Sequence, residues 1–236
     1  MVTDILIVPH RDDNYGFLIP APDGQTCLAV DAGDDLSYFE AACDRNWKIS
    51  TVLVTHHHGD HTSHLASLSK SAASVVGPGT IEGVTQPAAE GDTLTLDGLE
   101  IQVLATPGHT LDMLNFYIPA AKAVFTGDTL FTLGCGRLFE GTPEMMFESL
   151  KKLKALPDET LVYGAHEYTL ANLDFALSVF PDKEALANRA EILRQLRADG
   201  KPTVPSTIGL EKATNPFLIA ETAEEFARLR KAKDEF

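Results

Sequence analysis

Four histidines and one aspartate lie within the seven residues 55–61, directly after the apolar run 51–54. The apolar run is rich in β-branched residues and predicts a buried strand, so these polar side chains follow the end of a strand. Because side chains alternate along a strand, His56 and His58 are expected to point the same way and His57 the opposite way. Neutral imidazole and carboxylate are ligands of zinc, iron and manganese. The stretch therefore predicts a metal site, with a histidine-rich surface loop as the alternative.

Three further predicted strands also end in short loops that carry histidine or aspartate. The strands end at Leu104, Thr126 and Tyr163, and the loops carry His109, Asp128 and His166. A sheet holds the ends of its strands rigidly, which suits metal ligands that need accurate placement. One such histidine is explained by ordinary packing, but four polar strand ends favour a shared metal site. Asp60 and His61, at the start of an expected helix, are spaced to contribute to it.

The composition is that of a globular protein, and its charge is unevenly spread. A chain of 236 residues with 44% hydrophobic and 22% charged residues can bury a substantial core. The formal net charge of -15 argues against a general binder of nucleic acid or anionic membranes. Residues 183–236 carry ten Lys and Arg against nine Asp and Glu, so the remaining residues carry -16. The basic tail can supply cations that the acidic body lacks.

Cysteine usage indicates a reducing compartment, and the apolar runs predict neither a signal peptide nor a membrane span. Cys27, Cys43 and Cys135 are odd in number and widely spaced, which argues against a disulfide framework. The amino terminus lacks the basic and apolar regions of a signal peptide, and no apolar run approaches the roughly 20 residues that span a bilayer. We therefore expect a cytoplasmic protein without a membrane or nucleic-acid partner, acting as a monomer.

The order of predicted elements changes once along the chain. Up to about residue 165 strands and helices are mixed, and an Asp97-Gly98 turn joins two alternating segments as in a β-hairpin. After His166 the pattern is almost entirely helical. The expected helices cover residues 62–71, 142–156, 168–180, 183–198 and 222–233. We predict an α/β catalytic domain over residues 1–165 and a helical domain over residues 166–236.

The order of these ligand-type residues resembles the metallo-β-lactamase superfamily. The resemblance implies an αββα sandwich with two metal ions along one edge of its sheets. It implies that the first metal is held by His56, His58 and His109, the second by Asp60, His61 and His166, and that Asp128 bridges them. Asp31 matches an early aspartate of the superfamily that supports a ligand histidine from behind.

Further motifs resemble the glyoxalase II family, the hydroxyacylglutathione hydrolases. The motifs are Asp13-Asn14-Tyr15, Gly127-Asp128-Thr129-Leu130-Phe131, Gly134-Cys135-Gly136-Arg137, Tyr163-x-x-His166-Glu167-Tyr168-Thr169, Asn215-Pro216-Phe217 and Arg230-x-x-Lys233-Asp234. This resemblance implies that Arg137, Arg230 and Lys233 engage the glycine carboxylate of a glutathione thioester. Tyr168 would hydrogen-bond the tripeptide, and Phe139 would line the same site. On residue pattern alone, Arg230 and Lys233 read as a solvated helix face.

Four positions depart from the pattern of that family. Gly59 replaces a large residue, and Ser63-His64 replaces the usual Gly-Gly. Phe139 stands where many relatives carry tyrosine, and Ile219 where a basic residue is frequent. None of the four removes a predicted metal ligand, but the last two bear on the affinity for glutathione.

The predicted chemistry is hydrolysis of a thioester by a metal-bridging hydroxide. Two divalent ions about 3.5–4 Å apart lower the pKa of a shared water, and the oxyanion is stabilised by a metal. We expect two zinc ions, with iron or manganese as alternatives, and no catalytic side-chain nucleophile, since no G-x-S-x-G elbow is present. A thiolate leaving group needs no general acid. The alternatives are a persulfide dioxygenase that uses a single iron, and a non-catalytic relative.

Overall fold

The computed structural model describes residues 4–236, which form two compact units. The first unit comprises the chain up to Ala105 together with Asp112–Gly127, and the second comprises Thr106–Leu111 and Asp128–Phe236. Each unit has a hydrophobic core of its own. The predicted boundary between residues 165 and 166 is a different division of the chain and stays a prediction.

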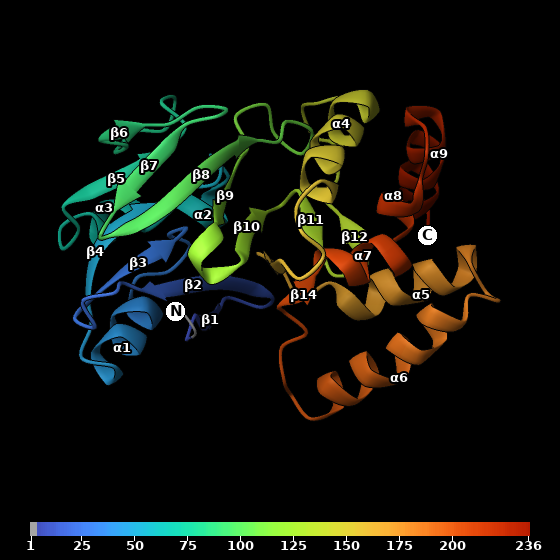
Figure 1. The fold of residues 1–236 in the computed structure, drawn as a ribbon, viewed down its shortest axis with the longest axis horizontal. Coiled ribbons are helices and arrows are strands. Elements are labelled where there is room, and N and C mark those ends of the chain that lie inside the picture. The colour runs from blue at the N-terminus through green and yellow to red at the C-terminus, as the bar shows by residue number, and fades with distance from the viewer. Residues whose placement is uncertain (1–3) are drawn as a thin grey trace. The chain divides into compact units, whose positions relative to one another are not determined.

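The first unit begins with a mixed sheet whose six strands follow the order of the chain (Figure 1). Its strands are β1 (Leu6–His10), β2 (Asn14–Pro20), β3 (Thr26–Val30), β4 (Lys48–Leu53), β5 (Ser74–Gly77) and β6 (Gln86–Pro87). Strands β1 to β3 are antiparallel, whereas β3 to β6 are parallel. Helix α1 (Leu36–Asp44) supplies the crossover that a parallel β3–β4 pair requires. The histidine stretch follows β4, as predicted.

Four later strands of the same unit form an antiparallel meander. They are β7 (Thr93–Leu96), β8 (Leu99–Ala105), β9 (Leu114–Ile118) and β10 (Ala123–Gly127), with a 3-10 turn η1 (Pro119–Ala121) between the last two. Asp97 and Gly98 join β7 to β8 with φ values of +50° and +81°. Two positive φ values are what a two-residue hairpin of the primed type requires, so the predicted Asp-Gly hairpin is confirmed.

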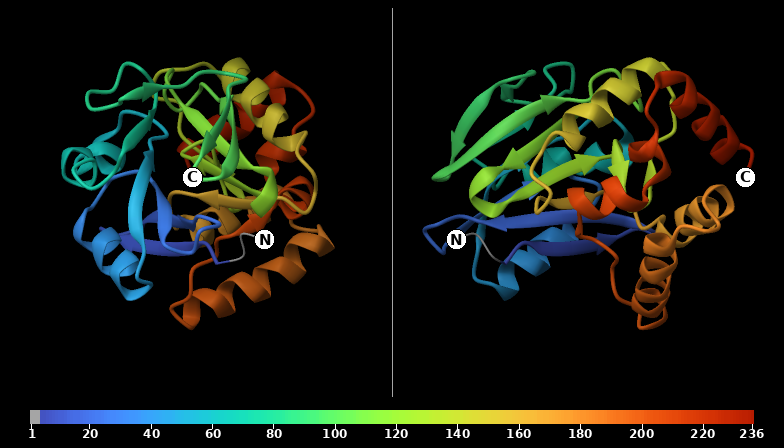
Figure 2. Two further views of the ribbon diagram at one scale, coloured as in Figure 1. Left: turned by 60° about the vertical axis from the view of Figure 1, so that its left-hand side comes forward. Right: turned by 45° about the vertical axis from the view of Figure 1, so that its right-hand side comes forward.

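Three layers are visible within the first unit: helices, the mixed sheet and the meander (Figure 2). Phe17 of β2 and Phe125 of β10 are buried with ring centroids 5.4 Å apart, so the sheets pack face to face through aromatic side chains. The opposite face of the mixed sheet is covered by α1 and by the short helix α3 (Leu65–Leu68), which follows the one-turn helix α2 (Gly59–Thr62). The Tyr38 hydroxyl donates to the Val30 carbonyl oxygen at 2.6 Å and ties α1 to β3.

The helix predicted over residues 62–71 is shorter in the structure, where α2 ends at Thr62 and α3 covers only Leu65–Leu68. The two are separate because His64 has φ -112° and ψ 13°, outside the helical region. The backbone N–H of His64 donates to the carbonyl oxygen of Ala32, and its Nδ1 lies 2.9 Å from the carbonyl oxygen of Gly33. These contacts hold residue 64 against the loop after β3.

The second unit is built mainly of helices, seen in yellow to red in Figure 1. They are α4 (Pro143–Lys154), α5 (Thr169–Val179), α6 (Glu184–Ala198), α7 (Ile208–Thr214), α8 (Pro216–Ile219) and α9 (Ala223–Asp234). The strands of the unit are the hairpin β11 (Leu130–Phe131) and β12 (Gly134–Cys135) and the pair β13 (Leu161–Gly164) and β14 (Ser206–Thr207). Thr142 caps α4 by accepting from the Met145 N–H, and Pro143 stands at the first helical position. No helix in residues 4–236 is long and apolar enough to cross a membrane.

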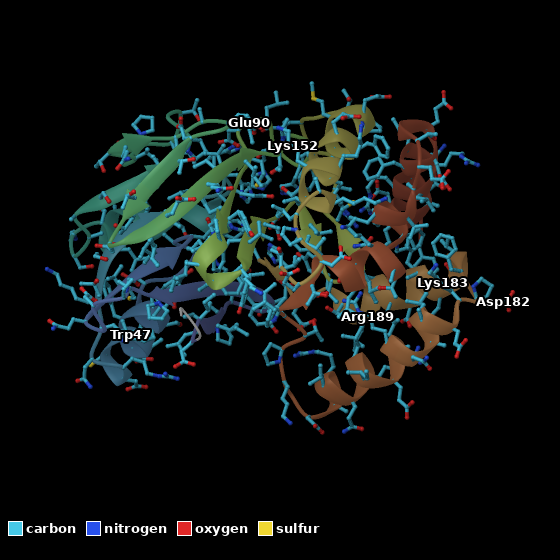
Figure 3. All side chains as sticks on the ribbon, viewed as in Figure 1. Trp47, Glu90, Lys152, Asp182, Lys183 and Arg189 are labelled. Carbon is cyan, nitrogen blue, oxygen red and sulfur yellow. The ribbon has the colours of Figure 1, made fainter. Side chains whose placement is uncertain are left out.

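A buried ion pair joins the helices of the second unit to the β11–β12 hairpin. Arg189, labelled in Figure 3, extends from α6 and pairs with the fully buried Glu211 of α7. The other Glu211 oxygen accepts from the Leu133 backbone N–H and from the Asn215 side chain, both at 2.9 Å. Asn215 also donates to the carbonyl oxygen of Gly134 at 3.1 Å. A single carboxylate therefore holds the turn of the hairpin, where Leu133 has φ +59°.

Candidate metal centre

The histidine loop, residues 55–61, is a compact group of imidazoles in the first unit. His56 and His61 are fully buried, and their ring centroids lie 4.2 Å apart. The ring centroid of His58 lies 4.7 Å from that of His56. His57 has a side chain 44% exposed, and its Nδ1 lies 3.0 Å from an Asp112 carboxylate oxygen. His57 is thus the exposed imidazole of the loop and contacts Asp112, although its ring centroid lies only 5.0 Å from that of His58.

Asp31 sets the protonation of two imidazoles in this loop. Its carboxylate accepts from the Thr55 backbone N–H at 2.8 Å and from the Thr55 hydroxyl at 2.9 Å, and it lies 2.8 Å from His61 Nδ1. A carboxylate only accepts, so His61 carries its proton on Nδ1. The single hydrogen of the Thr55 hydroxyl is donated to Asp31 in a hydrogen bond, so the hydroxyl oxygen accepts from His56 Nδ1, 3.0 Å away. Both imidazoles thereby keep the Nε2 lone pair for a cation.

Asp60 completes the group of ligand-type residues in the first unit. One of its carboxylate oxygens accepts from the buried Asn14 side-chain amide at 2.9 Å and lies 3.3 Å from His61 Nε2. That nitrogen bears a lone pair in the tautomer set by Asp31. A lone pair facing a carboxylate oxygen is repulsive unless a positive charge lies between them. The pair formed by Asp60 and His61 is therefore suited to bind a metal ion.

A second set of ligand-type residues, His109, Asp128 and His166, lies in the second unit. All three are buried. Asp128 presents one oxygen to His109 Nε2 at 3.2 Å and the other to His166 Nε2 at 3.3 Å. His109 Nδ1 donates to the Arg137 carbonyl oxygen at 2.8 Å, so in the neutral imidazole the Nε2 lone pair faces a carboxylate. This arrangement also requires positive charge, and a carboxylate with one oxygen toward each imidazole suits a bridging role.

Backbone packing places Asp128 in this set. Gly136 follows β12, and a Cβ added to it would lie 2.0 Å from the Asp128 carbonyl oxygen and 3.1 Å from His109 Nδ1. Only glycine fits this close approach. The Gly-Cys-Gly-Arg motif therefore serves the predicted ligands through its backbone. His166 is supported differently, because the Tyr168 ring stacks on it with centroids 4.8 Å apart and planes 3° from parallel.

The predicted substrate-binding residues, all in the second unit, differ widely in exposure. The Arg137 side chain is 68% exposed, and Phe139 is 64% exposed with its ring centroid 5.1 Å from that of His109. Tyr168 is 39% exposed. Lys233 donates to the Ala171 carbonyl oxygen at 2.7 Å. These residues are available to a solute at least in part.

Arg230 is buried, contrary to the interpretation drawn from the residue pattern alone. It is 5% exposed, so the interpretation as a solvated helix face is wrong. Its guanidinium donates to the Cys135 carbonyl oxygen at 2.9 Å and to an Asp234 carboxylate oxygen at 2.8 Å, and it lies over the Phe217 ring. The residue pattern around position 230 did not predict this burial, because the contact that buries Arg230 is with Cys135, 95 residues earlier in the chain.

Cys135 is a packed residue in this structure. Burial raises the pKa of its thiol to about 11, although the nearby Arg230 acts in the opposite direction. A thiol with that pKa is almost entirely protonated at neutral pH, so it is a poor nucleophile. The interpretation of Cys135 as a small packed side chain is thus supported.

Two residues that support the ligand-type side chains were missed by sequence reasoning. Thr55 relays the Asp31 interaction to His56, and Asn14 binds Asp60, although Asn14 had been noted only as part of a family motif. A hydroxyl directly before a histidine run, and an amide at the start of an early strand, carry no distinguishing pattern of their own. Both roles depend on contacts between segments far apart in sequence.

Nearly the whole chain is similar to known proteins. The family model for the Metallo-beta-lactamase superfamily matches residues 76–166, and that for the Hydroxyacylglutathione hydrolase C-terminus matches residues 167–236. The hydroxyacylglutathione hydrolase of Brucella anthropi is 44% identical over 245 residues, which cover 96% of this chain and 94% of that protein. The similarity therefore extends over the catalytic and the helical regions alike.

Solved structures give the same fold at lower identity. ETHE1 from Myxococcus xanthus is 27% identical with a TM-score of 0.74, covering 98% of this chain and 90% of that one. TTHA1623 in a di-iron-bound form is 25% identical with a TM-score of 0.64, covering 92% of this chain and 100% of that one. The predicted α/β metallo-β-lactamase fold with a C-terminal helical region is confirmed. The chain belongs to the hydroxyacylglutathione hydrolase family of the metallo-β-lactamase superfamily.

Proposed function

We propose that the protein hydrolyses S-(2-hydroxyacyl)glutathione thioesters, such as S-lactoylglutathione, to glutathione and a 2-hydroxy acid. The observation that carries this proposal is the 44% identity to hydroxyacylglutathione hydrolases over 96% of the chain. The two sets of ligand-type residues support it, because each has imidazole Nε2 lone pairs turned toward a carboxylate. The reaction would serve the removal of methylglyoxal.

The two sets together would hold two divalent metal ions. Family membership and the donor chemistry support assigning His56, His58 and His109 to one ion, Asp60, His61 and His166 to the other, and Asp128 to both. Zinc is the proposed metal, with iron or manganese as alternatives, since imidazole and carboxylate bind all three. When bound, the ions supply a water activated near neutral pH and positive charge for the thioester oxygen.

The residues of the chain supply orientation and binding. Asp31 and the Arg137 carbonyl fix the tautomers of His61 and His109, and Tyr168 keeps the His166 ring in place. Departure of the glutathione thiolate requires no proton donor, because a cysteine thiol has a pKa near 8.5. This agrees with the lack of an activated side-chain nucleophile in the sequence.

The helical region would bind the glutathione part of the substrate. Arg137, Phe139, Tyr168, Arg230 and Lys233 are the proposed contacts, and the family model that begins at residue 167 supports a functional boundary close to residue 166. The Arg137 side chain is exposed and open to the substrate, whereas the buried Arg230 would act partly by holding the structure of the binding site. We propose that the protein works as a cytoplasmic monomer, without nucleic-acid or membrane partners.

Assay of S-lactoylglutathione hydrolysis together with elemental analysis tests this function. Thioester hydrolysis with two metal ions per chain is expected. One iron per chain with oxygen consumption on glutathione persulfide would instead establish the dioxygenase alternative. The adjacent histidines provide matched variants: His56→Ala and His58→Ala are expected to lose metal and at least about 100-fold activity, and His57→Ala to retain both.

A further inference from the structure

Three cations and one carboxylate form a cluster in the second unit: Arg137, Arg230, Lys233 and Asp234. Arg230 Nη2 donates to Asp234 Oδ1 at 2.8 Å, and Arg137 Nε lies 3.7 Å from the same oxygen. Burial, and then the Arg230 charge, lower the pKa of Lys233, whereas Asp174 and Asp234 act in the opposite direction. Lys233 therefore shares the electrostatic environment of both arginines. Asp234 is the carboxylate that contacts both arginines, and Asp174 is a second carboxylate that acts on Lys233.

The cluster retains capacity for a further anion. Arg230 is 5% exposed, and its Nε is a buried donor that finds no acceptor among residues 4–236. The Arg137 side chain is 68% exposed and makes a long contact of 3.7 Å to Asp234. The Arg230 Nε is enclosed by protein, whereas the loosely paired Arg137 guanidinium is open to solvent and can bind another carboxylate. The cluster can therefore take a further anion through Arg137.

Asp234 stands at a position that disfavours an acidic residue. It is the last residue of α9, where the helix dipole is negative and a carboxylate costs about 0.3–1 kcal/mol. Its side chain is 42% exposed, so a solute can reach it. The helix dipole thus disfavours aspartate at residue 234, and the pair with Arg230 one turn earlier and the nearby Arg137 offset this cost.

We propose that Asp234 is an internal competitor for the carboxylate of the substrate and thereby limits affinity for the glutathione product. The inference rests on the proposed function. In the free protein the Asp234 carboxylate accepts from Arg230 Nη2 and lies 3.7 Å from Arg137 Nε. The glycine carboxylate of glutathione has the same chemistry and would share or displace these contacts. Asp234 thus reduces the positive charge offered to every ligand that carries the glycine carboxylate, including the thiol product that has to leave.

The test compares glutathione binding by wild type, Asp234→Asn and Asp234→Ser, measured by calorimetry on the metal-loaded protein. Both substitutions are expected to tighten binding by about threefold to tenfold, the range of one partly exposed charge interaction. KM for S-lactoylglutathione should fall with little change in kcat, because the change lies in binding common to ground and transition states. The gain should disappear for the glycinamide analogue of glutathione, which has no glycine carboxylate.

Glu235→Gln is the matched control, because it removes the same charge from the neighbouring residue, whose side chain is 69% exposed and lies 3.9 Å from Lys231. This variant should bind glutathione as wild type does. The inference would be overturned if both Asp234 variants bound glutathione as wild type does or more weakly, or if both unfolded. It would also be overturned if Glu235→Gln gained as much affinity, or if the gain persisted with the glycinamide. Failure of thioester hydrolysis in wild type would refute the proposed function separately, since calorimetry needs no turnover.

Discussion

The histidine loop of the first unit and the ligand set of the second unit are organised in opposite ways. In the loop, four ligand-type residues come from one short stretch, and a single carboxylate, Asp31, orients two of them. In the second set, three residues come from three separate segments and are oriented by a backbone carbonyl, a close-packed glycine and a stacked ring. Orientation by a side chain can be removed by one substitution. Orientation by backbone depends on the fold around it.

The largest effect is expected from Asp128→Ala, which removes the one carboxylate of the second set. Both His109 and His166 then lose the oxygen that faces their Nε2. Activity should fall by at least about 100-fold, and metal content should fall with it. Elemental analysis and thioester hydrolysis measure both. The control, Asp112→Ala, removes an aspartate that contacts His57 and should leave activity and metal content near normal. Near-normal turnover in Asp128→Ala would refute the bridging role.

A smaller effect is expected from Asp31→Asn, which tests side-chain orientation in the histidine loop. Asparagine tolerates the φ of +63° at this position, so the backbone should be kept. The carboxamide cannot accept all the bonds that Asp31 accepts, and its N–H group would compete with His61 Nδ1–H. Metal affinity should fall by about 10–100-fold with the fold intact. The measurement is competition with a chelator, and Asp34→Asn on the same loop is the control. Unchanged affinity would show that the tautomer of His61 is set by other contacts.

Glu211→Ala is expected to change activity least and the free energy of unfolding most among these variants. The substitution leaves Arg189 buried without its partner, which costs about 3–5 kcal/mol. The free energy of unfolding in denaturant measures this cost. The control is Lys212→Ala on the same helix as Glu211. It breaks the surface ion pair between Lys212 and Asp158 and should lower the free energy of unfolding by at most about 1 kcal/mol. A similar cost for the two variants would mean that Glu211 does not hold the β11–β12 turn.

The contrast between the two sets also explains what the sequence can predict. Ligand-type residues were found because they follow apolar runs, and the Asp-Gly hairpin because its φ values demand those residues. The helix predicted over residues 62–71 is shorter in the structure, since the contacts of His64 with the loop after β3 outweigh local propensity. The β11–β12 hairpin, the burial of Arg230 and the Glu211 network were missed. Each depends on partners tens of residues apart, for which periodicity gives no signal.

The buried thiols have a consequence for a protein that handles glutathione. Such a protein is exposed to oxidised glutathione, which forms mixed disulfides with accessible thiolates. Burial raises the pKa of Cys27 to about 12 and that of Cys135 to about 11, so both remain protonated and shielded from exchange. Cys43, on α1, is the exposed thiol of the three. Oxidative modification should therefore fall on α1, distant in sequence from every predicted ligand of the second set, and leave the Gly-Cys-Gly-Arg motif unmodified.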